Sequence, residues 1–178
     1  MRSNLDLLLL LGLRDIRTKY SRTFLGVFWT LFPALVQLVI YTVFFGKVVR
    51  IESDGIQYTS FTIVGLSLWI LFSQILSVSS SAIYGNTTLI ARIWFPRMIL
   101  VLCPTIEKLL DFAAYSLVSF LYLSYSGYFN IYYIPFSIVA GVWAIFASLS
   151  LAIGIAAVSL KFRDILQFTG YLVTSLLY

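Results

Sequence analysis

Histidine is absent from the 178 residues, and cysteine occurs once, as Cys103. Without histidine the chain cannot build a Ser-His-Asp triad or the usual His-containing zinc site, and a single cysteine cannot form an internal disulfide. We therefore expect no catalytic residue and no metal site. Charge is also scarce, because Asp, Glu, Lys and Arg together make up only 11% of the chain, against about 25% in a soluble domain.

The residues that are present are mostly apolar, with 61% hydrophobic content. A soluble fold of this size has too little interior to hide so much apolar surface. The composition predicts an all-α integral membrane protein that is surrounded by lipid. In such a chain the net charge of +5 reports orientation, because basic residues accumulate in cytoplasmic loops, so no nucleic-acid partner is expected.

The uncharged runs are long enough to form several membrane spans, since a helix needs about 20 apolar residues to cross the bilayer. The uncharged run 112–160 has 49 residues, too many for one crossing, and the turn residues near Gly127 divide it. The run 165–178 would rise only about 21 Å as a helix. The chain 1–178 is thus predicted to be one transmembrane domain with about five spans, at 24–45, 58–83, 103–126, 132–159 and, in part, 165–178.

The first 22 residues predict an interfacial helix. Their leucine run is too short to span, and no small-residue cleavage site follows it. The charged turn after the leucines consists of Arg14, Asp15, Arg17 and Lys19. We expect 1–22 to lie flat, with the leucines in lipid and the charged turn at the headgroups. A generic basic anchor with no mechanical role is the alternative.

Basic residues also predict the orientation. Nine of them fall in segments 1–22, 84–97 and 160–164, against two in loop 46–57. The positive-inside rule then places the N-terminus in the cytoplasm, and the two loops 84–97 and 160–164 on the same side.

Three ionisable residues, Glu107, Lys108 and Asp111, lie at spacings that place them on one face of a helix. We expect this charged cluster in the first turns of a span that begins near Cys103. Ionisable groups in a span are functional by default, although a shallow depth also allows snorkelling. Two roles of this cluster stay open. It contacts the substrate, or it forms a salt bridge to a neighbouring cytoplasmic arginine, which would be Arg14, Arg17 or Arg97.

Aromatic residues make up 17% of the chain, and many lie toward the outer ends of the predicted spans. Most are typical of an interfacial aromatic belt. The alternative is that some turn inward and stack on the apolar faces of sugar rings. Tyr41, Tyr122 and Tyr125 are our candidates for such a glycan path.

Three motifs together resemble a known family. The first reads RDIRTKY at 14–20. It continues as TFLGVFW at 23–29 and ends with Pro33. The second is the loop GNTTLI at 85–90 followed by FPR at 95–97, and the third is the Arg163-Asp164 pair. In this order and spacing they resemble the ABC-2-type permeases that export O-antigen, capsule and teichoic acid.

The resemblance implies a six-helix half-transporter that forms a homodimer around a channel in the bacterial inner membrane. A separate ATP-binding subunit, holding ATP and Mg²⁺, would drive export of a lipid-linked polysaccharide. This chain itself should bind no cofactor, because its Gly46-Lys47 pair lacks the rest of a phosphate-binding loop. The sixth span and exit-gate helices of the family have no counterpart in the 178 residues. A drug or lipid permease and a non-transporting scaffold are the alternatives.

By the same resemblance, loop 84–97 holds a coupling helix that docks on the ATP-binding subunit. Asn86 or Thr87 can cap such a helix, and Pro96 separates it from the next span. Its contact residues would be Leu89, Ile90 and Arg92. An ordinary membrane re-entry turn is the alternative.

Arg163 and Asp164 are a second candidate contact with the ATP-binding subunit. Taken alone, they are typical of a helix start, where a carboxylate is stabilised by unpaired N–H groups.

Overall fold

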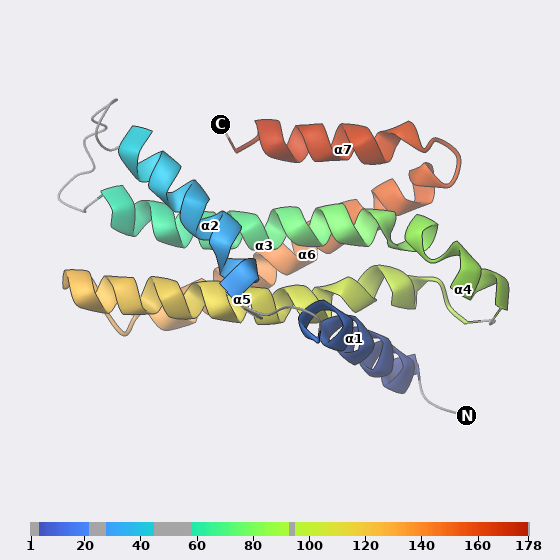
Figure 1. Cartoon of the computed structure of the whole chain (residues 1–178), viewed down its shortest axis with the longest axis horizontal. Helices are drawn as coiled ribbons and strands as arrows, with labels where there is room; N and C mark the ends of the chain where they lie inside the picture. The colour runs from blue at the N-terminus through green and yellow to red at the C-terminus, as the bar shows by residue number, and fades with distance from the viewer. Residues whose placement is uncertain (1–3, 22–27, 45–57, 93–94, 178) are drawn as a thin grey trace.

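The computed structural model describes residues 4–21, 28–44, 58–92 and 95–177, and every regular element among them is a helix. The helices are α1 (Asn4–Tyr20), α2 (Phe28–Tyr41), α3 (Tyr58–Gly85), α4 (Thr87–Arg92), α5 (Met98–Ser126), α6 (Tyr133–Ser159) and α7 (Asp164–Ser175). The all-helical prediction is confirmed for this part of the chain. Figure 1 shows α3, α5, α6 and α7 running lengthwise, with α1 lying obliquely against α5 and α4 at one end.

Helix α3 forms the centre of the bundle, because it packs along both α5 and α6. Its fully buried side chains include Leu71, Ile75 and Ser79. On α6 the buried positions are small, with Ser148 and Ala152 both at 0% exposure. Small residues at a helix interface let two backbones approach closely, which favours tight packing within a bilayer.

Two of the described helices are long and apolar enough to cross a membrane. They are Tyr58–Gly85, with a mean hydropathy of 1.9, and Ile134–Ser159, with a mean hydropathy of 2.3. Helix α6 also directs large apolar side chains outward, among them Phe136, Trp143 and Phe146. Leu31–Phe44 forms a shorter apolar helix. The number of spans stays a prediction.

Helix α5 begins at Met98, five residues before the predicted start at 103. Apolar residues continue back to Met98, and Pro104 is accommodated near the beginning of the helix. Gly127 ends the helix in the left-handed conformation, with φ at 78°, which costs glycine little. Glu107 consequently lies about 14 Å along the helix axis, deeper in the helix than a start at 103 would give; where the charged cluster lies in the membrane span stays a prediction.

Candidate functional site

The turn between α3 and α4 is organised by Asn86. Its backbone carbonyl accepts the N–H groups of Leu89 and Ile90, both at 3.1 Å. Its side-chain nitrogen donates to the carbonyl of Ala82 at 2.9 Å, one turn back in α3. The Asn86 side chain therefore closes the end of α3, whereas we expected it to accept a hydrogen bond at the start of α4.

Helix α4 turns one apolar side chain inward. Ile90 packs against a buried cluster that contains Ile83, Val101 and Ala156. Thr87 is exposed, and Leu89 is half-buried. Ile90 is half-buried and helps to anchor α4 to the bundle, and its contact with a partner stays a prediction. Arg92 is the last residue of the helix, and its side chain lies outside the described part of the chain.

The turn between α6 and α7 meets the end of α3. The Arg163 guanidinium lies 4.8 Å from the centre of the Tyr84 ring, a favourable cation–π arrangement. Asp164 follows as the first residue of α7 and is exposed, where the helix N-terminus favours a carboxylate. Since Tyr84 precedes Asn86 by two residues, the structure brings the two predicted contact segments to one end of the bundle.

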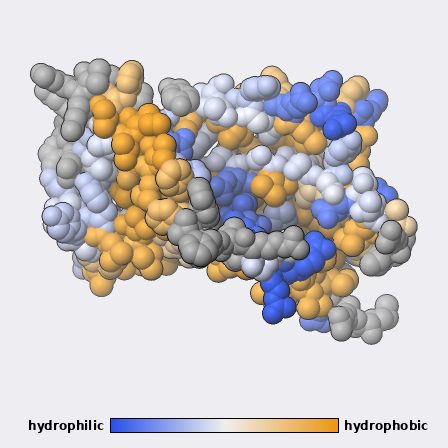
Figure 2. Space-filling model, viewed as in Figure 1, coloured by the Kyte–Doolittle hydropathy of each residue, from blue (hydrophilic) through white to orange (hydrophobic). Residues whose placement is uncertain are grey.

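The surface at this end, which we call the α4-end surface, is basic. Arg97, Lys161 and Arg163 are all exposed on it, and Figure 2 shows hydrophilic residues gathered at this end of the molecule. The Lys161 nitrogen lies 5.3 Å from the centre of the neighbouring Phe162 ring.

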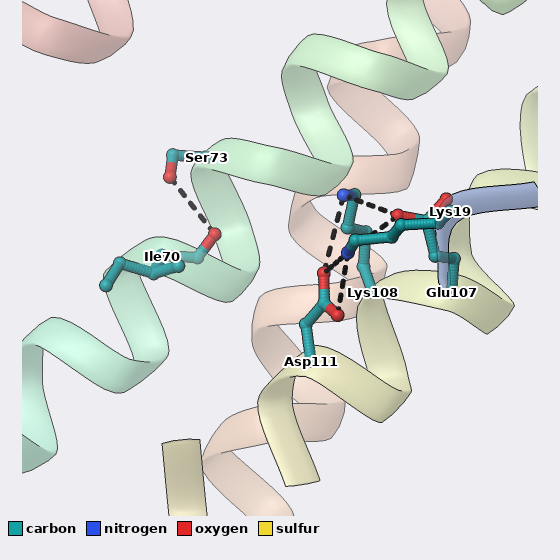
Figure 3. Close-up of polar contacts among 6 residues, drawn as sticks. All are labelled: Lys19, Ile70, Ser73, Glu107, Lys108 and Asp111. Atoms are coloured by element: carbon teal, nitrogen blue, oxygen red, sulfur yellow. Dashed lines mark hydrogen bonds and ion pairs between the residues drawn. The ribbon is translucent and has the colours of Figure 1, made fainter. Parts of the chain in front are cut away.

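An ion-pair network joins α1 to α5 (Figure 3). The Lys19 ammonium lies 2.6 Å from a carboxylate oxygen of Asp111 and 2.9 Å from one of Glu107. Lys108 lies 3.0 Å from Glu107 and 3.5 Å from Asp111. A salt bridge to a neighbouring arginine was one of the two interpretations left open by the sequence; the structure shows an ion pair of this kind, with Lys19 as the partner on α1. Substrate contact stays a prediction.

Burial of Lys19 lowers its pKa, but hydrogen bonds and charge attraction from Asp111 and Glu107 outweigh this effect and raise the pKa above its ordinary value. Lys19 consequently stays charged throughout the physiological range. Asp111 is only 2% exposed, so the paired lysines compensate a carboxylate that is removed from water.

The rest of α1 contacts α5 through its glycine and its aspartate. A Cβ atom added at Gly12 would lie 2.7 Å from Cδ1 of Ile106, so the two helices touch directly here. Asp15 accepts a hydrogen bond from the Cys103 sulfur at 3.6 Å and pairs with Arg14 at 2.7 Å. The charged residues of α1 therefore point in two directions. Asp15 and Lys19 contact α5, whereas Arg14 and Arg17 are exposed.

The three tyrosines suggested for a glycan path differ in exposure. Tyr41 is buried, and its hydroxyl donates to the carbonyl of Leu177 at 3.3 Å. Tyr122 is half-buried, and Tyr125 is 92% exposed. Any role in transport remains a prediction for all three.

Comparison with known proteins finds several similar proteins. No family model matches it. It is 27% identical over 169 residues to the O-antigen export system permease protein RfbA of Myxococcus xanthus, covering 94% of this chain. Two Klebsiella pneumoniae proteins with the same name are 29% and 28% identical over 107 residues, 60% of this chain.

The chain is similar to O-antigen export permeases. The resemblance inferred from the three motifs is thereby confirmed. The chain spans 64% of the length of the Myxococcus relative and 40% of the Klebsiella relatives.

Two residues that organise this permease-like chain were missed by sequence reasoning. Lys19 was grouped with the headgroup-facing charges, although its spacing of four residues from Asp15 put both on one face of α1. Tyr84 was treated as part of a loop, and no sequence pattern signalled its contact with Arg163, because that contact joins residues 79 positions apart.

Proposed function

We propose that this chain forms the membrane-spanning permease of an ATP-driven exporter that moves a lipid-linked polysaccharide across the bacterial inner membrane. The similarity to an O-antigen export permease over 94% of the chain carries this proposal. The chain contributes the channel walls, and hydrolysis of ATP takes place on a separate subunit.

Membrane insertion is supported by the outward faces of α3 and α6. Phe61 on α3 and Trp143 on α6 are 69% and 72% exposed, and exposing such rings to water is costly. Lipid contact removes that cost. The excess of basic residues at the α4-end surface supports a cytoplasmic position for that surface and for the N-terminus.

Docking of the ATP-binding subunit is supported by the geometry of the α4-end surface. Helix α4 is fastened to the core by Ile90, and the α6–α7 turn is linked to α3 through Arg163 and Tyr84. A displacement of either segment would therefore be transmitted to α3, the central helix. In the assembly we propose, two copies of the permease enclose the channel and two ATP-binding subunits dock below.

Deletion of the complete gene in its native host tests the proposal. We expect loss of polysaccharide from the cell surface and accumulation of lipid-linked polysaccharide on the cytoplasmic face of the inner membrane, both reversed by the intact gene. The ATP-binding subunit should co-purify with the permease. Unchanged surface polysaccharide, together with changed export of a drug or lipid, would favour the alternative permease, and absence of any ATP-binding partner would favour a scaffold.

A further inference from the structure

A cavity of about 510 Å³ lies between α3, α5 and α6, in the half of the bundle farthest from α4. This volume lies within the range of small-molecule sites, about 300–1,000 Å³. The walls are mainly apolar and include four phenylalanine rings from the three helices, Phe61, Phe112, Phe120 and Phe136. Phe61 and Phe136 are mostly exposed, so the cavity is open at the side.

The length of the cavity matches one leaflet of a bilayer. On α5 its lining runs from Phe112 to Leu123, which is about 16 Å along the helix axis. The hydrocarbon core is about 30 Å thick, and each leaflet contributes half of it. A single acyl chain therefore has the length to run along this cavity from its outer end to its floor.

Ser60 can donate a hydrogen bond at the outer end of the cavity. Of the four other serines that line the cavity, Ser67, Ser119 and Ser137 donate to carbonyls of their own helices, and Ser116 is half-buried. Ser60 is the third residue of α3. Its hydroxyl is buried and has no hydrogen-bond partner among the described residues. Such a group costs free energy until an acceptor meets it.

We propose that this cavity binds the acyl chain of a bilayer phospholipid, with a glycerol-ester carbonyl accepting a hydrogen bond from Ser60. An apolar cavity of this kind does not attract water, and an empty one forfeits dispersion contacts along its walls. A lipid chain restores those contacts. The ester group lies at the boundary of the hydrocarbon core, where the outer end of α3 places Ser60.

Photocrosslinking tests this site, which depends on the membrane placement proposed above. The full-length permease is reconstituted with its ATP-binding subunit in phosphatidylethanolamine vesicles that contain a trace of phosphatidylcholine with a diazirine in one acyl chain. After illumination, mass spectrometry maps the labelled residues. We expect label concentrated on residues that line the cavity, such as Phe120 and Leu123. Even labelling of all lipid-facing residues would overturn the site while preserving membrane placement, and absence of any label would contradict the membrane placement itself.

Two matched glycine variants sharpen the test. Gly65 lines the cavity, and a Cβ atom added there meets nothing within 4 Å, so the side chain of Gly65→Leu starts in open space and occupies volume at the cavity wall. Gly154 on α6 is equally unobstructed but lies outside the lining. We expect Gly65→Leu to reduce cavity labelling by about tenfold, the loss that accompanies about 1.4 kcal/mol of binding, and Gly154→Leu to leave it unchanged. Equal labelling of both variants would overturn the proposal.

Ser60→Ala should lower cavity labelling by about three- to tenfold, the range of a lost hydrogen bond, without changing thermal stability. Competition identifies the lipid. Unlabelled phospholipid should displace the probe in proportion to its amount. Displacement by a small amount of polyprenyl phosphate would show instead that the site selects the isoprenoid carrier, and would overturn the phospholipid assignment.

Discussion

Lys19 places its ammonium nitrogen 2.6 Å from a carboxylate oxygen of Asp111, and this contact ties the interfacial helix α1 to the longest helix of the bundle, α5. Asp111 is 2% exposed. A buried charge that loses its partner is strongly destabilising, so the contact determines whether α1 stays docked on α5.

Lys19→Met should therefore lower the free energy of unfolding, although Lys108 still compensates part of the Asp111 charge. A double-mutant cycle with Asp111→Asn measures the coupling, which we expect at about 1–3 kcal/mol. Thermal unfolding in detergent provides the readout. Arg17→Met is the matched control, because Arg17 is exposed on the same helix. If the effects of Lys19→Met and Asp111→Asn on stability are additive, the proposed link between Lys19 and Asp111 is contradicted.

The pH dependence of stability should follow the raised pKa of Lys19. A group whose pKa is raised by folding contributes its full stabilisation below its unfolded-state pKa, about 10.4 for lysine. The contribution is lost only as pH rises through the folded-state pKa. The stability difference between wild type and Lys19→Met should consequently stay constant between about pH 7 and 9. A difference that shrinks within this window would show that folding lowers the pKa of Lys19 instead of raising it.

Gly12→Ala should loosen the same helix pair, because the new Cβ atom would lie 2.7 Å from Cδ1 of Ile106. Overpacking of this kind costs about 1–3 kcal/mol. Ile106→Val removes that terminal carbon, so the double variant should recover part of the lost thermal stability. Gly170→Ala on α7 is the control, since its added Cβ meets nothing within 4 Å. A drop of the same size in the control would assign the effect to glycine replacement in general.

Tyr84→Leu should weaken the link between the α6–α7 turn and α3. A cation–π contact at an exposed site contributes about 0.5–1 kcal/mol, so we expect a two- to fivefold loss of export with little change in thermal stability. Phe162→Leu is the control, because Lys161 and Phe162 are neighbours within one turn and join no separate segments. If Tyr84→Leu exports polysaccharide as well as the control Phe162→Leu does, the Arg163–Tyr84 contact has no role in transport.

The sequence predicted the main helices well because the bilayer imposes a strict length on an apolar run. The predicted spans 58–83 and 132–159 lie within two residues of α3 and α6. The third span was predicted to start near 103 because that start gives adequate length, which already included the two carboxylates, Glu107 and Asp111; α5 itself begins at Met98. In the structure Lys19 and Lys108 compensate the two carboxylates, which lets the helix continue past them.

Contacts between distant segments could not be predicted in the same way. Helical spacing shows which residues share a face, but the partner of that face depends on how two helices cross. The absence of a side chain at Gly12 brings α1 onto Ile106, and that approach selects Lys19 over the arginines. Helix α4 has six residues, too few for periodicity to show that Ile90 faces inward.

The orientation of α4 can be tested by cysteine labelling. In a Cys103→Ser background, which removes the buried native thiol, a cysteine is introduced at Thr88 or at Ile90 and treated with a membrane-impermeant maleimide. Thr88 is exposed, whereas Ile90 packs against the core, so Thr88→Cys should react much faster. The reaction should occur in inside-out vesicles and be slowed by the bound ATP-binding subunit. Equal rates at the two positions would contradict the packing of α4, and labelling of right-side-out vesicles would reverse the proposed topology.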